Sequence, residues 1–221
     1  MSYGVNPCHD GVEDGVIEAY RLLSTSALGH LTHTGYLPGL RALHSDTHLC
    51  GRALTAEIDS RDSRVLREAL IMARPGDVLV IVDHDAVSGC EPCLACWGEL
   101  RTLAACVKGL AGVVVIGAIT DVQALRALSL PIFHRDISAL TIPAGESRWG
   151  ELNRPVSHAG VGIAPGDLIF GDDDGLFALS PARATSLLSA IQEKEAADAR
   201  RRDELLARLG DSRLGSSGAR E

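Results

Sequence analysis

The sequence has no long apolar run and no run of basic residues. None of its apolar stretches approaches the roughly 20 residues that a helix needs to cross a bilayer. Lys and Arg are scattered, and the formal net charge is −8 at pH 7. Such a chain lacks the positive surface that attracts nucleic acid or an anionic membrane. We therefore expect neither nucleic acid nor a membrane among its partners.

Two further absences concern location and domain number. The segment MSYGVNPCHDGVEDG at the start lacks the basic-then-apolar pattern of a secretory signal, which favours a cytoplasmic protein. No linker rich in Ser, Gly or Pro interrupts the chain before Pro181. With 221 residues, of which 46% are hydrophobic, one substantial core is expected. We predict a single domain over residues 1–210 and a disordered tail over 211–221.

Short apolar runs alternate with helical patterns in the first half of the chain. The runs at 49–58, 77–84 and 112–118 are rich in Val, Ile and Leu, which is typical of strands buried on both faces. Segments 63–73 and 98–111 between them have helical periodicity. This alternation predicts an α/β protein with a parallel or mixed central sheet and covering helices. Further strands are expected at 131–136, 156–163, 167–170 and 175–180.

A long helix is predicted from Pro181 to about Leu209. Its first half has an apolar stripe of Leu187, Leu188 and Ile191. Its second half, EKEAADARRRDELLARL, is charged on most faces. We expect that half to project into solvent or to lie on another subunit.

Polar residues follow two of the apolar runs, at the ends where α/β proteins bind their ligands. One group is Asp83-His84-Asp85, and another is Thr120-Asp121. Glu99 stands near the start of a predicted helix, and so does Asp121. Either carboxylate can be a helix cap or a ligand, because the free N–H groups at a helix start favour negative charge.

The stretch WGELRTLAACVKGLAGVVVIGAITD (97–121) resembles the signature of the RraA-like family. This family includes 4-hydroxy-4-methyl-2-oxoglutarate aldolases and regulators of ribonuclease E activity. Its signature is a Gly-acid pair, twenty further residues and then Arg-Asp, and here Gly98-Glu99 and Thr120-Asp121 flank residues 100–119. GRALTAEI, PGDVLVIVD and GVGIAPGDLIFGDDDGLFALSPARA are also similar to family segments, so the likeness covers roughly residues 15–200.

The resemblance implies an α/β/β/α-type sandwich of the swivelling-domain kind, assembled as homotrimers or hexamers with sites between subunits. It implies Mg²⁺ or Mn²⁺ bound through Asp121, with waters held by Glu99; hard oxygen ligands and retained waters suit these ions. Backbone N–H groups of Leu100 and Arg101 would hold a substrate carboxylate. Trp97, Gly98 and Thr120 would line the same site. The implied reaction is lyase chemistry on a small 2-oxo or hydroxy carboxylic acid, by aldol cleavage or decarboxylation through a metal-stabilised enolate.

Position 120 departs from the signature, because it holds Thr where the family has Arg. Threonine carries no charge and cannot bind a carboxylate through two parallel hydrogen bonds. Three interpretations follow: a nearby cation, Arg101 or Arg135, substitutes; the substrate is different; or catalysis has been lost. The alternative functions are accordingly a repurposed isomerase or dehydratase, and a non-catalytic regulatory binding protein.

Other residue clusters are weaker candidates for ligands or acid-base groups. Cys90, Cys93 and Cys96 have the spacing of a zinc or iron–sulfur site, but no second CxxC pair exists, and Cys106 is expected to face the core. A cysteine-rich loop over the pocket is the simpler interpretation. The six cysteines, which are expected to be thiols or ligands rather than disulfides in a cytoplasmic protein, are Cys8, Cys50, Cys90, Cys93, Cys96 and Cys106.

Histidines and a further acidic stretch complete the candidates. His30 and His33 are placed one helical turn apart as proton donors or ligands, or as a polar face. His44 and His48, beside Asp46, are possible metal ligands. His84 titrates near neutral pH and is a possible general base. Asp172, Asp173 and Asp174 lack the remaining EF-hand ligands and are expected to form a turn.

Overall fold

The computed structural model describes residues 4–7, 11–59, 63–84, 93–142 and 149–217, with side chains up to Leu209. Its helices are α1 (Asp14–Tyr20), α2 (Thr25–Leu31), α3 (Val65–Met72), α5 (Glu99–Lys108), α6 (Val122–Leu125) and α7 (Pro181–Ser217). Its longer strands are β3 (His48–Ile58), β4 (Asp77–Asp83), β6 (Gly112–Ile119), β7 (Ile132–Ile137), β11 (Leu168–Asp172) and β12 (Gly175–Leu179). Its short strands are β1 (Gly4–Val5), β2 (Arg41–Ala42), β5 (Ala95–Trp97), β8 (Glu151–Leu152), β9 (Val156–His158) and β10 (Val161–Ile163).

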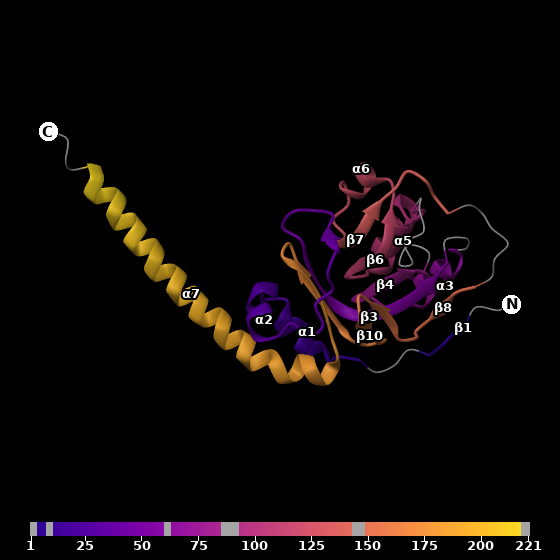
Figure 1. Ribbon diagram of the computed structural model, residues 1–221, viewed down its shortest axis with the longest axis horizontal. Helices are drawn as coiled ribbons and strands as arrows, with labels where there is room; N and C mark the ends of the chain where they lie inside the picture. Colours follow the sequence, from indigo (N-terminus) through magenta and orange to yellow (C-terminus); the bar gives the residue numbers. More distant parts are fainter. Residues whose placement is uncertain (1–3, 8–10, 60–62, 85–92, 143–148, 218–221) are drawn as a thin grey trace.

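A mixed sheet forms the centre of the molecule (Figure 1). The order of its strands is β1-β8-β3-β4-β6-β7-β2. Strands β3, β4, β6 and β7 are parallel to one another, so their carboxyl ends lie along one edge. Strand β5 pairs in parallel with β6 near that edge, and β11 adds to β3 in the antiparallel direction.

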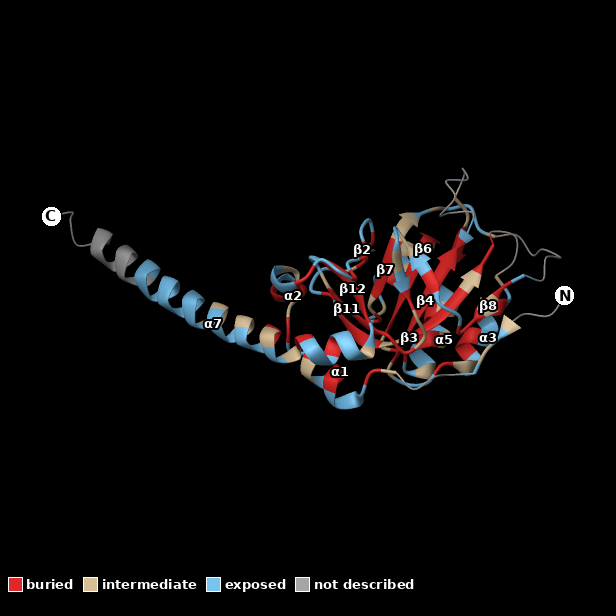
Figure 2. Cartoon of the chain, turned by 60° about the horizontal axis from the view of Figure 1, so that its bottom comes forward, coloured by how far each residue is buried: buried red, intermediate tan, exposed pale blue. Residues whose placement is uncertain are grey.

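Three apolar clusters show that the elements are layered. One cluster lies between the sheet and helices α3 and α5. A second joins the other face of the sheet to the hairpins β9–β10 and β11–β12. The third packs α1, α2 and the start of α7 against β11 and β12. Strands β4 and β6 are buried along their whole length because both of their faces are covered (Figure 2).

The predicted fold class, a mixed α/β fold with a central mixed sheet and a C-terminal helix, is confirmed. The three apolar runs form β3, β4 and β6, and the two helical patterns between them form α3 and α5. The predicted strand at 156–163 is instead a hairpin of β9 and β10, because the chain turns at Ala159-Gly160, where φ is positive at both residues.

Helix α7 begins at Pro181 as predicted but continues to Ser217, beyond the predicted end near Leu209. The segment 211–217, expected to be disordered, is therefore helical. Gly210 lowers helix propensity by about 1 kcal/mol, but no proline follows it to stop the helix. The far half of α7 projects from the body and is exposed through Leu209 (Figures 1 and 2). Within the described residues, no helix is both long enough and apolar enough to cross a membrane.

Candidate functional site

The site is built on the junction between β5 and α5. Trp97, the last residue of β5, is fully buried, and its Nε1 donates a hydrogen bond to Oγ1 of Thr102 over 2.8 Å. The Thr102 hydroxyl donates in turn to the carbonyl of Gly98 over 3.0 Å. These two bonds tie the first turn of α5 to the strand before it. The start of α5 therefore has a fixed position relative to the sheet.

The end of β6 brings the second half of the motif to this junction. Trp97 pairs with Ile119 across the parallel strands, and the amide of Thr120 donates to the carbonyl of Trp97 over 2.9 Å. Asp121 follows in the left-handed conformation, with φ 56° and ψ 31°. Its Oδ2 accepts a hydrogen bond from the amide of Glu99 over 3.0 Å. The two acids predicted to share a site are therefore adjacent.

Gly98 is the residue that permits this close approach. A Cβ at this position would lie 2.4 Å from Oδ2 of Asp121 and 2.9 Å from Cγ2 of Thr120. Its φ of −155° is an extended conformation that any residue can adopt. The requirement for glycine here is therefore a matter of space and not of backbone freedom.

All seven residues predicted for the site line one hollow of about 410 Å³. They are Trp97, Gly98, Glu99, Leu100, Arg101, Thr120 and Asp121. The amides of Leu100 and Arg101 lie in the first turn of α5, where they have no intrahelical acceptor. Sequence reasoning missed Ser63, Thr141 and Ile142, which also line the hollow. They come from segments distant in sequence, and no motif marks them.

The hollow has an uneven charge distribution. The carboxylate-bearing residues Glu99 and Asp121 are exposed, whereas Arg101 is partly buried. The guanidinium of Arg101 donates to the carbonyl of Cys96 over 2.5 Å and to Oγ of Ser63 over 2.8 Å. Burial lowers the pKa of Arg101 from its ordinary value. Arg135, the other cation considered, does not line the hollow and pairs with Asp136 over 2.6 Å.

Two carboxylates and a helix start are a donor set that suits a hydrated hard cation. In the described part of the chain, no group of three or more His, Cys, Asp or Glu side chains is arranged to hold a metal ion. Mg²⁺ commonly binds through one or two carboxylates and keeps several waters, whereas structural zinc needs four protein ligands. Glu99 and Asp121 therefore fit Mg²⁺ or Mn²⁺ better than zinc.

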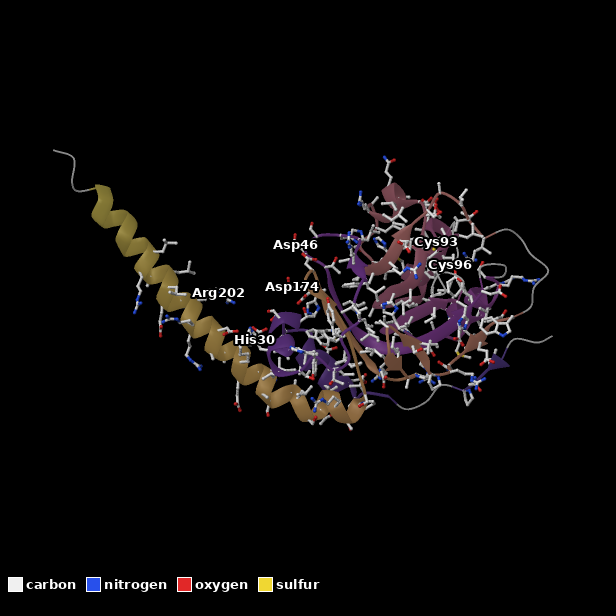
Figure 3. The ribbon with its side chains drawn as sticks, in the orientation of Figure 1. His30, Asp46, Cys93, Cys96, Asp174 and Arg202 are labelled. Atoms are coloured by element: carbon white, nitrogen blue, oxygen red, sulfur yellow. The ribbon has the colours of Figure 1, made fainter. Side chains whose placement is uncertain are left out.

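The predicted cluster of Cys90, Cys93 and Cys96 lies partly outside the described residues. Cys90 lies outside the described residues, and Cys93 is half-buried. Cys96 is buried within β5, where burial raises the pKa of its thiol to about 12 (Figure 3). Cys106 is exposed, so the prediction that it faces the core was wrong. The buried face of α5 is instead formed by Thr102 and Ala105.

The histidine pairs are not metal sites among the described residues. His30 lies on α2, but that helix ends at Leu31, so His33 is not on the same helical face. His30 lies close to α7 (Figure 3). His44 and His48 contact different backbone carbonyls, those of Leu125 and Leu23, at 3.3 Å each.

The two remaining polar groups have structural partners. Asp83 is buried at the end of β4, and Nε2 of His84 contacts Oε1 of Glu57 at 2.6 Å; Asp85 lies outside the described residues. The aspartates at 172–174 form the predicted turn. Asp172 accepts a hydrogen bond from the amide of Thr25 over 2.7 Å, and Asp173 accepts one from the amide of Asp46 over 2.7 Å.

Known proteins match this chain over most of its length. A protein of Halalkalibacterium halodurans, named "Putative 4-hydroxy-4-methyl-2-oxoglutarate aldolase", is 34% identical over 185 residues, covering 82% of this chain and 84% of that protein. The crystal structure of Streptomyces coelicolor RraAS2, described as an unusual member of the RNase ES inhibitor RraA family, has a TM-score of 0.75. It is 26% identical and covers 88% of this chain and 98% of its own.

A second solved structure agrees in fold. The RNA-processing inhibitor RraA from Thermus thermophilis is 27% identical, with a TM-score of 0.60, and covers 71% of this chain and 92% of its own. The family model RraA-like, described as Aldolase/RraA, matches residues 16–177, which include every residue of the hollow. On this match and the shared fold, the chain belongs to the RraA-like family.

Proposed function

We propose that the chain is a divalent-metal-dependent lyase acting on a small 2-oxo or hydroxy carboxylic acid. The observation that carries the proposal is the contact between the two halves of the motif. Glu99 and Asp121 meet at the start of α5, with Oδ2 of Asp121 on the amide of Glu99, inside one hollow of about 410 Å³. The relative from Halalkalibacterium halodurans is named "Putative 4-hydroxy-4-methyl-2-oxoglutarate aldolase", which is consistent with this proposal.

The residues of the hollow have separable roles in this proposal. The amides of Leu100 and Arg101 lie at the positive end of α5 and bind the substrate carboxylate. Asp121 and Glu99 would hold the cation. When bound, a divalent ion supplies Lewis acid polarisation of the carbonyl and stabilises the negative charge that develops there. Trp97 is buried beneath the hollow, and its hydrogen bond to Thr102 holds the first turn of α5 in place.

Thr120 shapes which acid is accepted. It lines the hollow beside Asp121 and offers a hydroxyl, which donates one hydrogen bond but carries no charge. A substrate group that faces Thr120 is therefore expected to be neutral. We propose that the substrate differs at this position from one that requires a cation there.

The decisive experiment is turnover by Asp121→Asn against a panel of 4-hydroxy-2-oxo acids, with pyruvate release measured in Mg²⁺, in Mn²⁺ and in EDTA. We expect metal-dependent release by the wild type and a loss of at least about a hundredfold in the variant, because a ligand to the ion is lost. Asp174→Asn, on the exposed turn between β11 and β12, is the matched control. Turnover that survives both EDTA and Asp121→Asn would refute the proposed function.

We also propose that the protein is a homotrimer or hexamer whose site is completed by a neighbouring subunit. Exposed apolar side chains on α5 support this, since Leu100, which lines the hollow, is 81% exposed and Val107, near the end of the helix, is 89% exposed. Burial of such side chains on association is favourable by about 25 cal/mol per Å². Light scattering coupled to gel filtration tests it, and a monomeric wild type would contradict it.

A non-catalytic regulatory role is the second candidate function. The similarity to RraAS2, described as belonging to an RNase inhibitor family, favours it. In that role the protein would bind a protein partner equally well as wild type and as Asp121→Asn. The same variant therefore separates the two functions, since only the lyase requires the carboxylate.

A further inference from the structure

Arg101 is the cation of the hollow. Among the residues that line it, the charged ones are Glu99, Asp121 and Arg101. The two acids are exposed to solvent and carry charge at little cost, whereas Arg101 is partly buried. A buried charge is costly unless a group of opposite charge or a ligand compensates it.

The partners of Arg101 in the described chain are neutral. Its guanidinium donates to two backbone carbonyls, those of Cys96 and Ser63, and to the Ser63 hydroxyl. No carboxylate of the described residues pairs with it. The nearby Cys96 thiol is neutral at physiological pH, because burial raises its pKa to about 12. These contacts fix the position of the guanidinium, and no carboxylate within the described ranges compensates its positive charge.

The location of Arg101 on its helix also argues for a ligand. Gly98 is the N-cap of α5, so Arg101 is the third residue of the first turn. The partial positive charge at a helix start disfavours a cation there and favours an anion. The chain thus places two sources of positive potential, the helix start and the guanidinium, in one hollow. An anion bound between the helix start and the guanidinium would compensate the positive charge of both.

Arg135 offers no such arrangement. Its Nε donates to Asp136, a pairing that neutralises its charge, and it lies outside the residues that line the hollow. Thr120 lines the hollow but is neutral. Of the two arginines and the threonine near the end of β6, only Arg101 both lines the hollow and has a charge that no described carboxylate pairs with.

We propose that the Arg101 side chain is the carboxylate-recognising group of this site, and that a substrate carboxylate binds between its guanidinium and the first turn of α5. The inference deepens the proposed function, on which it rests for the chemical class of the ligand. Arg101 is then a determinant of specificity, selecting acids whose carboxylate reaches this wall of the hollow. Ser63 is a positioning residue, because it acts by holding the guanidinium.

The test is the affinity for oxalate, a small dicarboxylate, measured by isothermal titration calorimetry with and without Mn²⁺. We expect Arg101→Met to weaken oxalate binding by about 10- to 100-fold, the range for a lost hydrogen bond to a charged group. Arg101→Lys keeps the positive charge and should lose less oxalate affinity than Arg101→Met. Arg135→Met, a change of the same kind outside the hollow, should alter affinity by less than about twofold.

Rescue separates recognition from a structural effect. Because Thr120 lines the same hollow, Thr120→Arg in the Arg101→Met background returns a cation to it, and we expect it to recover at least about tenfold of the lost affinity. A purely structural role for Arg101 would not be rescued from another position. Thermal melting of each variant shows whether it is folded.

The outcomes are distinguishable from failure of the proposed function. Binding of Mn²⁺ alone, followed by paramagnetic resonance, reports on Asp121 and is expected to be the same in Arg101→Met and wild type. If Arg101→Met is folded and binds oxalate as tightly as wild type in both conditions, the inference is wrong. A wild type that binds no oxalate with or without Mn²⁺ also overturns it. A wild type that binds oxalate but no Mn²⁺ would contradict the metal-binding role of Asp121 and leave the role of Arg101 supported.

Discussion

Substitution of Gly98 by alanine tests whether the Asp121 carboxylate needs the space that the missing side chain leaves free. The added Cβ would lie 2.4 Å from Oδ2 of Asp121, far inside van der Waals contact, and 2.9 Å from Cγ2 of Thr120. The nearer atom is the end of a flexible side chain, so the carboxylate moves and the backbone stays. That movement breaks the hydrogen bond from the Glu99 amide to Asp121.

The expected effects on stability and on metal binding are of different size. Loss of one hydrogen bond at a largely exposed position costs about 0.5–1.5 kcal/mol of unfolding free energy. For a domain of this size each kcal/mol lowers Tm by about 2–4 °C, so Tm should fall by about 1–6 °C. Displacing a group that orients a metal ligand typically costs about 10- to 100-fold in metal affinity. Gly98→Ala should therefore remain folded but bind Mn²⁺ poorly.

The assay is a Mn²⁺ titration at a temperature well below Tm, beside a thermal melt of the same samples. Gly29→Ala is the matched control, because a Cβ at this position on α2 would contact nothing within 4 Å. The control should keep its Mn²⁺ affinity and gain up to about 1 kcal/mol from helix propensity. Equal Mn²⁺ affinity in Gly98→Ala and wild type would refute the role given to this close approach.

Three further predictions concern the framework of the site and the titrating groups of the core. Thr102→Val leaves the buried Trp97 N–H without its acceptor, so urea denaturation should show a loss of about 1–3 kcal/mol. A thiol reagent at pH 8 should modify exposed Cys106 rapidly and spare buried Cys96, whose thiol has a pKa of about 12; equal rates would contradict the burial. Burial lowers the pKa of His134, so the unfolded chain binds more protons than the folded chain as pH falls below the ordinary value of 6.5. Stability should fall with pH in that range, and less steeply in His134→Leu, which chemical denaturation at pH 7 and pH 5 can measure.

The central strands could be predicted because their environment is uniform. Strands β4 and β6 are covered on both faces, so their sequences are continuous apolar runs. The spacing of Gly98-Glu99 and Thr120-Asp121 could also be interpreted, since a helix and a strand between them return the chain to the same edge of a parallel sheet. Strand β5 could not be predicted, because three residues after a cysteine-rich segment have no periodicity. Backbone pairing with β6 and with Thr141, which are distant in sequence, makes them a strand.

Side-chain direction was the other property that the sequence did not determine. Cys106 was expected to face the core as a small apolar residue, but the helix presents Thr102 and Ala105 there. Thr102 can be buried because its hydroxyl accepts a hydrogen bond from Trp97 and donates one to the carbonyl of Gly98. Arg101 could point to solvent or back toward the sheet, and the choice depends on Ser63, which is distant in sequence. Periodicity assigns faces to a helix, but tertiary partners decide which polar residues are buried.

Three departures from ordinary local preference meet in the hollow, and together they favour a small-molecule site over a purely regulatory surface. Gly98 has no room for a side chain, Asp121 has the left-handed conformation that costs most residues energy, and Arg101 brings an uncompensated cation to a helix start. Such conflicts with local rules concentrate where a ligand must be bound. A protein that only presented its outer surface to a partner would gain nothing from them, because all three lie within a concave space lined by both motif acids. A bound cation would compensate the acids and a bound carboxylate would compensate the arginine, so the pair accounts for the charges of the site better than either ligand alone.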